Sequence, residues 1–409
     1  MKKLIIFMFS IVLLGSCGKK GCTDINATNY NSDATTDDGT CEYNSNSWEK
    51  YLGDSLNEFG NSIAELIDGG YLVLGHSQNS NNQFQMSLSK IDEDGNELWN
   101  KLYIEGSSSY GYHILKTNSG NFLLIGSSNQ NNNSDVYLVN IDEDGNEIWR
   151  NTYDNFGNES AYYGKQDDNG NFILVGNGYQ TGSLADVYLM KIQNNGTFIW
   201  GKYFGASGGD IGYSVEITSE NNYLVTGWIT SSLDNSQNLY LIKTNNDGIM
   251  IWEKTFSSSF VNAGTSVIED GNGDYVISGF TGEMNNPNNS DILLLKTDTN
   301  GNQLWLKTFN ESFKDYASQI LKTSNNEYVI VGHTSATAGT GVDNYDVLLL
   351  KIDENGTFIW SKKYGGTSYD EASSVINTAD NGFAMCGRTD SYGSGLYDKY
   401  IIKTNNNGE

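Results

Sequence analysis

The sequence predicts an all-β fold, a seven-bladed β-propeller of four-stranded antiparallel blades. A tryptophan and a glycine each recur seven times at intervals of 50 to 55 residues, and an aromatic residue lies four positions before each glycine. No helical spacing of apolar residues appears after residue 16. A period near 50 with short apolar runs is typical of propeller repeats. The tryptophans are Trp48, Trp99, Trp149, Trp200, Trp252, Trp305 and Trp360; the glycines are Gly75, Gly126, Gly176, Gly227, Gly279, Gly332 and Gly387.

Each repeat reads as four short strands in a fixed order. A run of alternating polarity, such as residues 214–218, predicts the first strand, and a turn such as 68–70 follows it. The next run, 71–75, is almost continuously apolar, which is typical of a strand buried on both faces. A polar loop leads to a third strand such as 347–351. An Asp-Gly or Asn-Gly turn, as at 92–96, then predicts a hairpin to a fourth strand that carries the tryptophan.

The two ends of the repeat region predict how the ring closes. Residues 48–51 form a fourth strand without three strands before it, and residues 399–404 form a third strand without a fourth. We therefore expect the N-terminal strand to complete the last blade, which pairs both loose edges. The predicted propeller spans residues 47–405, and residues 406–409 are a short C-terminal tail.

Charge and composition exclude several classes of protein. The 409 residues include 50 Asp and Glu against 24 Lys and Arg, for a net charge of −26. A nucleic-acid binder that works through a basic groove is excluded, because phosphate recognition needs clustered cations. A hydrophobic content of 37% with 12% aromatic residues supports a packed core, so the chain is not a disordered acidic polymer.

Residues 1–16 are predicted to be a signal peptide. Lys2 and Lys3 precede an apolar run, 4–14, that is too short to span a bilayer. The Leu-Gly-Ser-Cys sequence that ends at Cys17 resembles the bacterial lipobox. This resemblance implies cleavage before Cys17, acylation of its thiol, and a protein held on the outer membrane, facing the cell surface or the periplasm. Retention in the inner membrane is the less favoured location.

Residues 17–46 are predicted to be a spacer closed by a disulfide. Cys22 and Cys41 bracket an acidic segment that resembles a short CTD…NYN…DDG[ST]C module of secreted bacterial proteins. In an oxidising envelope we expect these two cysteines to pair. The segment is rich in hard oxygen ligands, which predicts a calcium site; the alternative is a polar spacer without metal. The candidate ligands are Asp24, Asn29, Asn31, Asp33, Asp37 and Asp38.

Six of the repeats contain a Gly-x-x-x-Trp sequence, as at 95–99 and 356–360. This spacing resembles the tryptophan-docking motif of quinoprotein-like propellers. The longer pattern resembles propeller repeats of uncharacterised secreted bacterial proteins over residues 48–405. The resemblance implies the fold and says little about activity, and it carries no quinone cofactor. The tryptophans are expected to pack between blades, and Cys386 to be a buried, unreactive thiol.

No recognised catalytic motif stands out, and we predict a protein that is not an enzyme and requires no cofactor. Its three histidines, His76, His113 and His333, form no closely spaced metal-binding pair. The remaining enzymatic alternative is a lyase or hydrolase acting on a polysaccharide through Arg388, His333 and an acidic neighbour.

A variable position predicts a ligand-binding face. The residue after the repeated glycine varies, with six residue types in the seven repeats, and loops held by a rigid scaffold are common binding sites. Drift at a partly exposed position is the other interpretation. Carboxylates that begin the first strands lie on the same face. They either join the site, bind a cation, or only accept hydrogen bonds from strand-end amides. The predicted face comprises His76, Asn177, Trp228, Phe280, His333 and Arg388, with Asp210, Asp315 and Asp370.

Aromatic faces beside amides and carboxylates suit sugar rings. We therefore expect a non-enzymatic envelope lipoprotein whose propeller face binds a glycan or another envelope protein, and no nucleic acid. The alternative is a periplasmic scaffold lipoprotein of outer-membrane assembly.

Overall fold

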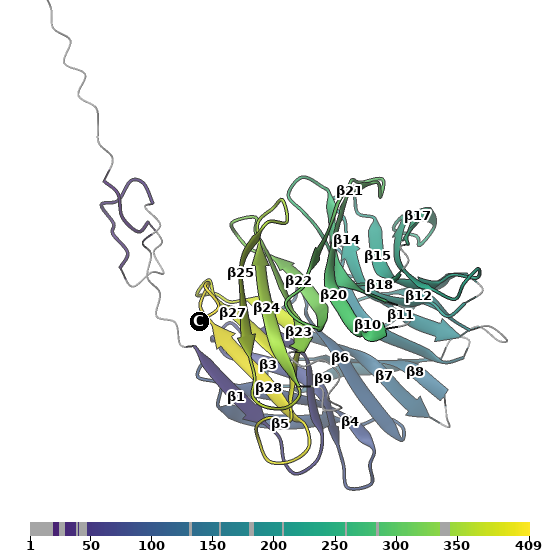
Figure 1. The fold of residues 1–409 in the computed structure, drawn as a ribbon. Coiled ribbons are helices and arrows are strands. Elements are labelled where there is room, and N and C mark those ends of the chain that lie inside the picture. Colours follow the sequence, from purple (N-terminus) through teal and green to yellow (C-terminus); the bar gives the residue numbers. More distant parts are fainter. Residues whose placement is uncertain are drawn as a thin grey trace, which may run out of the picture. The chain divides into compact units, whose positions relative to one another are not determined.

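The computed structural model describes residues 19–23, 29–37, 40, 47–130, 133–154, 157–179, 184–206, 208–257, 260–283, 286–335 and 344–409. The chain divides into two compact units, Met1–Asn46 and Ser47–Glu409. The described part of the larger unit consists of strands, turns and loops without a helix (Figure 1). None of the described segments forms a helix with the length and hydropathy needed to span a bilayer.

In the smaller unit, the backbones of Lys20 and Thr36 pair in an isolated parallel bridge. Cys22 is 1% exposed and forms a disulfide. Its expected partner Cys41 and the expected lipidation site Cys17 lie outside the described residues.

The predicted calcium ligands of this unit make contacts within the module. The Asn31 Oδ1 accepts the Asp33 amide at 3.0 Å, and the Asp33 carboxylate pairs with Lys19 at 2.7 Å. The Asn29 side-chain amide donates to the Thr40 carbonyl. Calcium binding stays a prediction. Asp37 is exposed, and Asp24 and Asp38 lie outside the described residues.

The larger unit is a series of four-stranded antiparallel meanders, each following the predicted strand order. One contains β2 (Glu58–Glu65), β3 (Tyr71–Gln78), β4 (Phe84–Ile91) and β5 (Glu97–Tyr103). The next contains β6 (Ser108–Lys116), β7 (Phe122–Gln130), β8 (Asn133–Ile141) and β9 (Glu147–Tyr153). Then come β10 (Glu159–Gln166), β11 (Phe172–Tyr179), β12 (Ala185–Ile192) and β13 (Phe198–Phe204). They are followed by β14 (Ile211–Ile217), β15 (Tyr223–Thr230), β16 (Gln237–Thr244) and β17 (Met250–Phe256).

The C-terminal half continues the same pattern. One meander contains β18 (Phe260–Glu269), β19 (Tyr275–Glu283), β20 (Asn286–Thr297) and β21 (Gln303–Phe309). Another contains β22 (Lys314–Lys322), β23 (Tyr328–Ser335), β24 (Tyr345–Ile352) and β25 (Phe358–Tyr364), and a single parallel bridge joins these two into one sheet. The last sheet runs β26 (Asp370–Asn377), β27 (Phe383–Thr389), β28 (Asp398–Thr404) and β1 (Trp48–Leu52). The all-β class and the four-stranded antiparallel units are thus confirmed.

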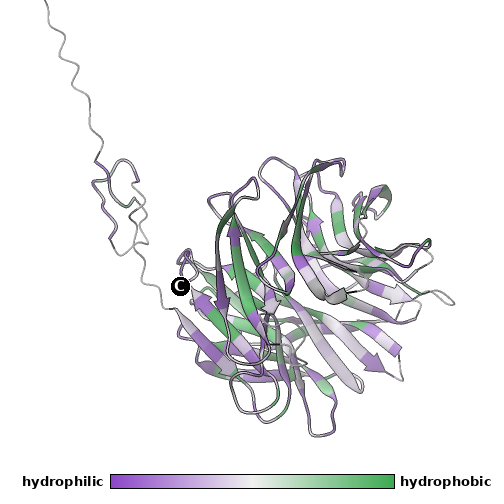
Figure 2. Ribbon diagram, viewed as in Figure 1, coloured by the Kyte–Doolittle hydropathy of each residue, from purple (hydrophilic) through white to green (hydrophobic). Residues whose placement is uncertain are grey.

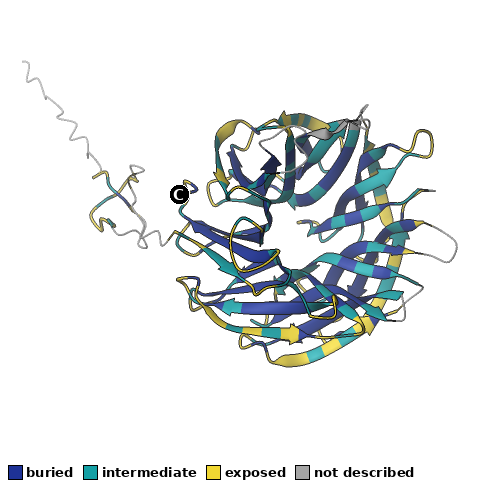
Figure 3. Cartoon of the chain, turned by 60° about the horizontal axis from the view of Figure 1, so that its bottom comes forward, coloured by how far each residue is buried: buried dark blue, intermediate teal, exposed yellow. Residues whose placement is uncertain are grey.

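Apolar side chains fill the interfaces between consecutive units. Leu138 of β8 and Tyr188 of β12, for example, belong to one buried cluster. A further cluster contains Val73 of β3 and Ile401 of β28, so the first and last units also share a core. The second strands are mainly apolar up to the repeated glycine, where both faces are covered, and more polar after it, as in β3 and β7. Figure 2 shows hydrophobic residues along these strands, and Figure 3 shows exposed residues along loops and outer strands.

The repeated tryptophans pack on turn glycines of the following repeat. Gly301 has a φ of +74°, and a Cβ there would lie 3.0 Å from the Trp252 ring. Trp48 in β1 packs in the same way on Gly95 of the β2–β5 unit, where a Cβ would lie 2.9 Å from the ring. The left-handed backbone and the close ring both require glycine at this position. The tryptophans are half-buried at the outer strands, rather than deep in the core.

The C-terminal residues form one more turn of this kind. The amide of Glu409 donates to Asn405 Oδ1 at 2.9 Å, and the Tyr364 hydroxyl donates to the Gly408 carbonyl at 2.7 Å. Gly408 has a φ of +70° and lies against Trp360. Residues 406–409, expected to be a free tail, therefore pack on the larger unit.

Candidate functional site

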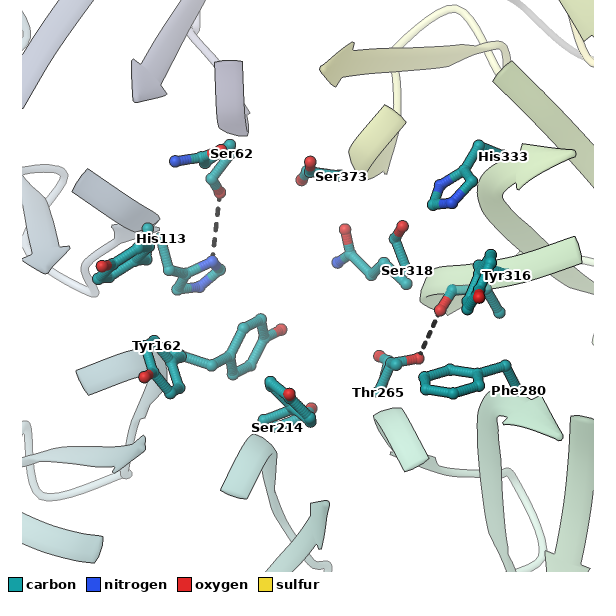
Figure 4. A pocket seen from close by; sticks show the side chains of 18 residues that line it. Ser62, His113, Tyr162, Ser214, Thr265, Phe280, Tyr316, Ser318, His333 and Ser373 are labelled. Carbon is teal, nitrogen blue, oxygen red and sulfur yellow. Dashed lines mark hydrogen bonds between the residues drawn. The ribbon is translucent and has the colours of Figure 1, made fainter. Parts of the chain in front are cut away.

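A cavity of about 400 Å³ lies where the first strands of all the four-stranded units meet (Figure 4). We call it the central cavity. Side chains from β2, β6, β10, β14, β18, β22 and β26 line it, together with Phe280 and His333 from two second strands. The structure describes no aspartate, glutamate, lysine or arginine among the lining residues. The cavity is therefore neutral in formal charge when its two histidines are neutral.

A β-bulge in each first strand turns one side chain into the central cavity. The pairing with the second strand shifts by one residue directly after a glycine or alanine, so one extra residue is inserted. The small residue is needed because first strands approach closely: a Cβ at Gly111 would lie 2.7 Å from the Gly75 carbonyl oxygen. The bulged residues are Asn61, Tyr112, Tyr162, Tyr213, Thr265, Ser318 and Ser373.

These bulged residues divide the cavity into two chemical halves. Tyr112, Tyr162 and Tyr213 come from consecutive units; the centroids of the first two rings are 5.1 Å apart, and those of the last two 6.1 Å. The opposite half presents hydroxyl groups, including those of Ser318 and Ser373 (Figure 4). The bulged tyrosines thus present rings on one side of the cavity. Bulged hydroxyl groups lie on the other side, where the rings of Phe280, Tyr316 and His333 also lie (Figure 4).

Histidines in and beside the cavity are held in the neutral form. Burial lowers the pKa of His113 to about 3, and burial together with nearby Lys399 and Arg388 lowers that of His76 to about 3. Burial also lowers the pKa of His333. At neutral pH these rings therefore act as hydrogen-bonding groups without charge.

The predicted ligand-binding face lies around this cavity. Phe280 and His333 line it directly. Three further variable residues make polar contacts with bulged residues that line the cavity. His76 Nδ1 lies 3.2 Å from Asn61 Nδ2, Asn177 accepts the Tyr162 hydroxyl at 2.8 Å, and Trp228 donates to the Tyr213 hydroxyl at 3.3 Å.

Arg388 takes part in a cluster on this face. It pairs across strands with Glu371, and its Nε lies 2.9 Å from the carboxylate. His333 Nδ1 lies 3.7 Å from the same carboxylate, which accepts the Tyr369 hydroxyl at 2.7 Å. The guanidinium also lies over three rings, 4.7 to 5.1 Å from their centroids: Phe59, Tyr369 and Tyr397.

Aromatic rings contact one another in a series that passes through every unit. Successive centroids are 4.7 to 6.4 Å apart. In order, the rings belong to Phe280, Tyr316, His333, Tyr345, Tyr369, Tyr397, Phe59, His76, Tyr110, Tyr112, Tyr162 and Tyr213. We call this series the aromatic belt.

The three predicted carboxylates hold loops and do not line the central cavity. Asp210, Asp315 and Asp370 are each 0% exposed. Asp210 accepts backbone amides at 2.7 and 2.8 Å, and Asp315 and Asp370 each accept one at 2.7 Å. Burial raises the pKa of Asp210 and of Asp315. The cavity is thus shaped by these loops, and its chemistry comes from other residues.

Cys386 is 1% exposed, and burial raises the pKa of its thiol. A thiol without solvent access and without thiolate character is unreactive. It belongs to the interface between the first and last units.

The comparisons with known proteins concern the fold. No family model matches the chain, and no curated protein matches it. Among solved structures, the polysaccharide lyase Uly1 is similar with a TM-score of 0.52 at 10% identity, covering 87% of this chain and 91% of that one. A protein of unknown function from Dyadobacter fermentans DSM 18053 gives 0.49 at 11% identity, with 87% and 99% covered. Sqt1 from Chaetomium thermophilum gives 0.47 at 12% identity, with 85% and 87% covered. The likeness to the lyase supports a propeller-like fold alone.

Proposed function

We propose that the four-stranded units are the blades of a closed seven-bladed β-propeller. Three observations support closure: β1 pairs with β28, Trp48 packs on Gly95 of the first unit, and one apolar cluster joins the first and last sheets. Closure packs the first and last sheets against each other, and a propeller then leaves only short blade edges.

Closure predicts that Trp48→Ala and Trp305→Ala destabilise the protein equally, each by about 2–4 kcal/mol. Both rings pack on a glycine of the following repeat, so both replacements remove an inter-blade contact. Urea unfolding of the full chain measures the effect, with Leu304→Ala, at a 51% exposed site, as the control. A near-zero effect of Trp48→Ala beside a large effect of Trp305→Ala would mean an open ring.

We propose that the protein binds a glycan in the central cavity and does not catalyse a reaction on it. The observation that carries this is the cavity itself, in which aromatic rings face hydroxyl groups in a volume of about 400 Å³. This size suits a small ligand, and sugar rings stack on aromatic faces while their edges form hydrogen bonds. The aromatic belt extends the stacking surface beyond the cavity.

Glycan-array binding of the full chain tests this proposal. Saturable binding to a defined saccharide is expected, and Trp228→Ala is expected to weaken it because the indole holds the Tyr213 hydroxyl. If a folded sample binds no saccharide on the array, the glycan proposal is wrong. Cross-linking in cells would then seek an envelope-protein partner, the second binding hypothesis.

We propose that Cys17 anchors the protein on the outer membrane. The lipobox resemblance supports this, and radiolabelled palmitate is expected to enter the wild type and not a Cys17→Ser variant. Protease added to intact cells distinguishes the cell surface from the periplasm. It degrades a protein on the surface and does not reach a scaffold in the periplasm.

A polysaccharide-acting enzyme is the second candidate function, favoured by the cluster of Arg388, Glu371 and His333 beside the cavity. In this cluster burial and Glu371 raise the pKa of Tyr369, so its hydroxyl is protonated at neutral pH. Incubation with a polysaccharide panel, followed by reducing-end and unsaturated-uronate assays, is expected to show no product. Turnover that disappears in Arg388→Ala would establish the enzyme instead.

A further inference from the structure

One unit interface departs from the repeat. In six units the third strand directs an apolar side chain toward the following unit, and each belongs to a buried cluster there. In β28 the same position holds Lys399, which is 1% exposed. The six apolar residues are Met86, Val136, Val187, Leu239, Ile292 and Val347.

The strand opposite Lys399 is altered as well. β4 carries Ser87 where other units have tyrosine or leucine, such as Tyr188, and Ser89 where others have aliphatic residues, such as Met190. Lys399 Nζ donates to Ser89 Oγ at 3.1 Å, and Asn100 Nδ2 donates to the same oxygen at 2.9 Å. At this interface Ser87 thus takes the place of a large side chain, and Ser89 and Lys399 take the places of apolar ones.

A pocket of about 470 Å³ occupies this interface. We call it the seam pocket. Lys399 lines it, and the carboxylates of Asp54, Glu58 and Glu97 line it too. Side-chain amides, among them that of Asn100, supply further hydrogen-bonding groups. The pocket shares no lining residue with the central cavity among the described residues.

The charges in the seam pocket lack partners at contact distance. Among the described residues, no carboxylate oxygen lies within 4.0 Å of Lys399 Nζ, and one neutral hydroxyl satisfies one of its three N–H donors. Glu58 is 6% exposed and accepts an amide hydrogen bond from Asp54 at 3.3 Å. The pocket carboxylates stay beyond contact distance of this ammonium, so its burial costs stability. A group that binds there gains by placing a negative charge in contact with it.

We propose that the seam pocket binds a free α-amino acid, whose carboxylate contacts Lys399 and whose ammonium faces the acidic residues. A simple anion does not fit, because three carboxylates line the same space. A neutral sugar brings no negative charge into contact with the buried ammonium. A zwitterion supplies both signs at once, and side-chain amides around it can accept and donate hydrogen bonds.

Isothermal titration calorimetry of the full chain with each common L-amino acid tests this site. One-to-one saturable binding of at least one amino acid is expected. The amide and the N-acetyl derivative of that amino acid are each expected to bind at least about tenfold more weakly, because each lacks one charge. No binding of any amino acid to the folded chain would overturn the proposal.

Variants separate the seam pocket from the rest of the molecule. Lys399→Met and Ser87→Tyr restore the residues of the other interfaces and are each expected to reduce binding at least about tenfold without loss of folding. Lys363→Met makes the same chemical change at an exposed site and is expected to have no effect, as is Tyr162→Ala in the central cavity. Unchanged binding in Lys399→Met would overturn the proposal, and the glycan site would be unaffected by that result.

Discussion

Lys399→Met is expected to stabilise the protein by about 3 kcal/mol at pH 7 in the absence of ligand. Burial lowers the pKa of Lys399 from 10.5 to about 8, and this difference corresponds to about 3 kcal/mol of unfavourable burial of the charged form. Methionine resembles the apolar residues of the other interfaces, so it removes the charge and fills space. A site that lowers stability in this way is typical of a functional site.

The same pKa sets the pH dependence of this effect. Below pH 8 the ammonium is present in both the folded and unfolded states, and the whole cost remains. Between pH 8 and 10.5 the unfolded chain holds a proton that the folded chain has lost, so wild-type stability rises relative to the variant. Above pH 10.5 both states are neutral, and the advantage of the variant disappears.

Urea unfolding of wild type and Lys399→Met at pH 7 and pH 10 measures this difference. Titrating groups that do not interact with Lys399 cancel in the comparison, whereas Glu58, His76 and Cys386 interact with it. A variant that is less stable than wild type at pH 7 would contradict the assignment of Lys399 as an uncompensated charge.

Tyr162→Ala is expected to weaken binding of the array-identified glycan by roughly 10- to 100-fold. Its ring lies in the middle of the three bulged tyrosines, and the centroids of its neighbours are 5.1 and 6.1 Å away. Tyr162→Phe keeps the ring and loses the hydrogen bonds of the hydroxyl group, including that to Asn177, so a change of about threefold or less is expected.

Calorimetric titration of the glycan into each variant measures this loss. Tyr179→Ala is the matched control, because Tyr179 belongs to the same sheet and is 41% exposed. Equal affinities of Tyr162→Ala and wild type would place the glycan elsewhere. Circular dichroism of each variant separates lost binding from lost folding.

The repeat made the strands predictable, because turns and buried strands have strong local signals. The Asp-Gly turn at residues 92–96 has Gly95 at a φ of +78°, and the Asp92 carboxylate accepts the Asn96 amide at 2.7 Å. The pairing of β1 with β28 also follows the prediction from the two ends of the repeat region. The half-buried position of the tryptophans did not follow from sequence, because it depends on how each outer strand meets the next turn.

Phe280 and His333 of the cavity are predictable from sequence, but its bulged residues are not, because a bulge breaks the alternation of inward and outward side chains. One inserted residue reverses which side chain faces inward, and no strand-by-strand pattern records this. A signal was present: a glycine or alanine recurs with the repeat period just before each bulged residue, as at Gly60, Gly111 and Ala161. The residue after that small residue, such as Tyr162, is the one that the bulge turns into the cavity.

The roles of the buried aspartates and of Lys399 are not predictable from sequence, for a different reason. The sequence gives no distinction between an aspartate that binds a ligand and one, such as Asp210, that accepts loop amides. Lys399 stands out from the aligned third strands, but its neighbour Ser89 lies more than 300 residues away. Only the pairing of the first and last units brings them together.

Ser318→Trp tests most directly whether the central cavity is the binding site. Ser318 projects from a bulge into the half of the cavity that carries hydroxyl groups (Figure 4), and an indole there occupies the space opposite the tyrosines. Calorimetry with the array-identified glycan is expected to detect no binding, while a Ser232→Trp control at an exposed loop site keeps wild-type affinity. Wild-type affinity in folded Ser318→Trp would contradict the central cavity as the glycan site.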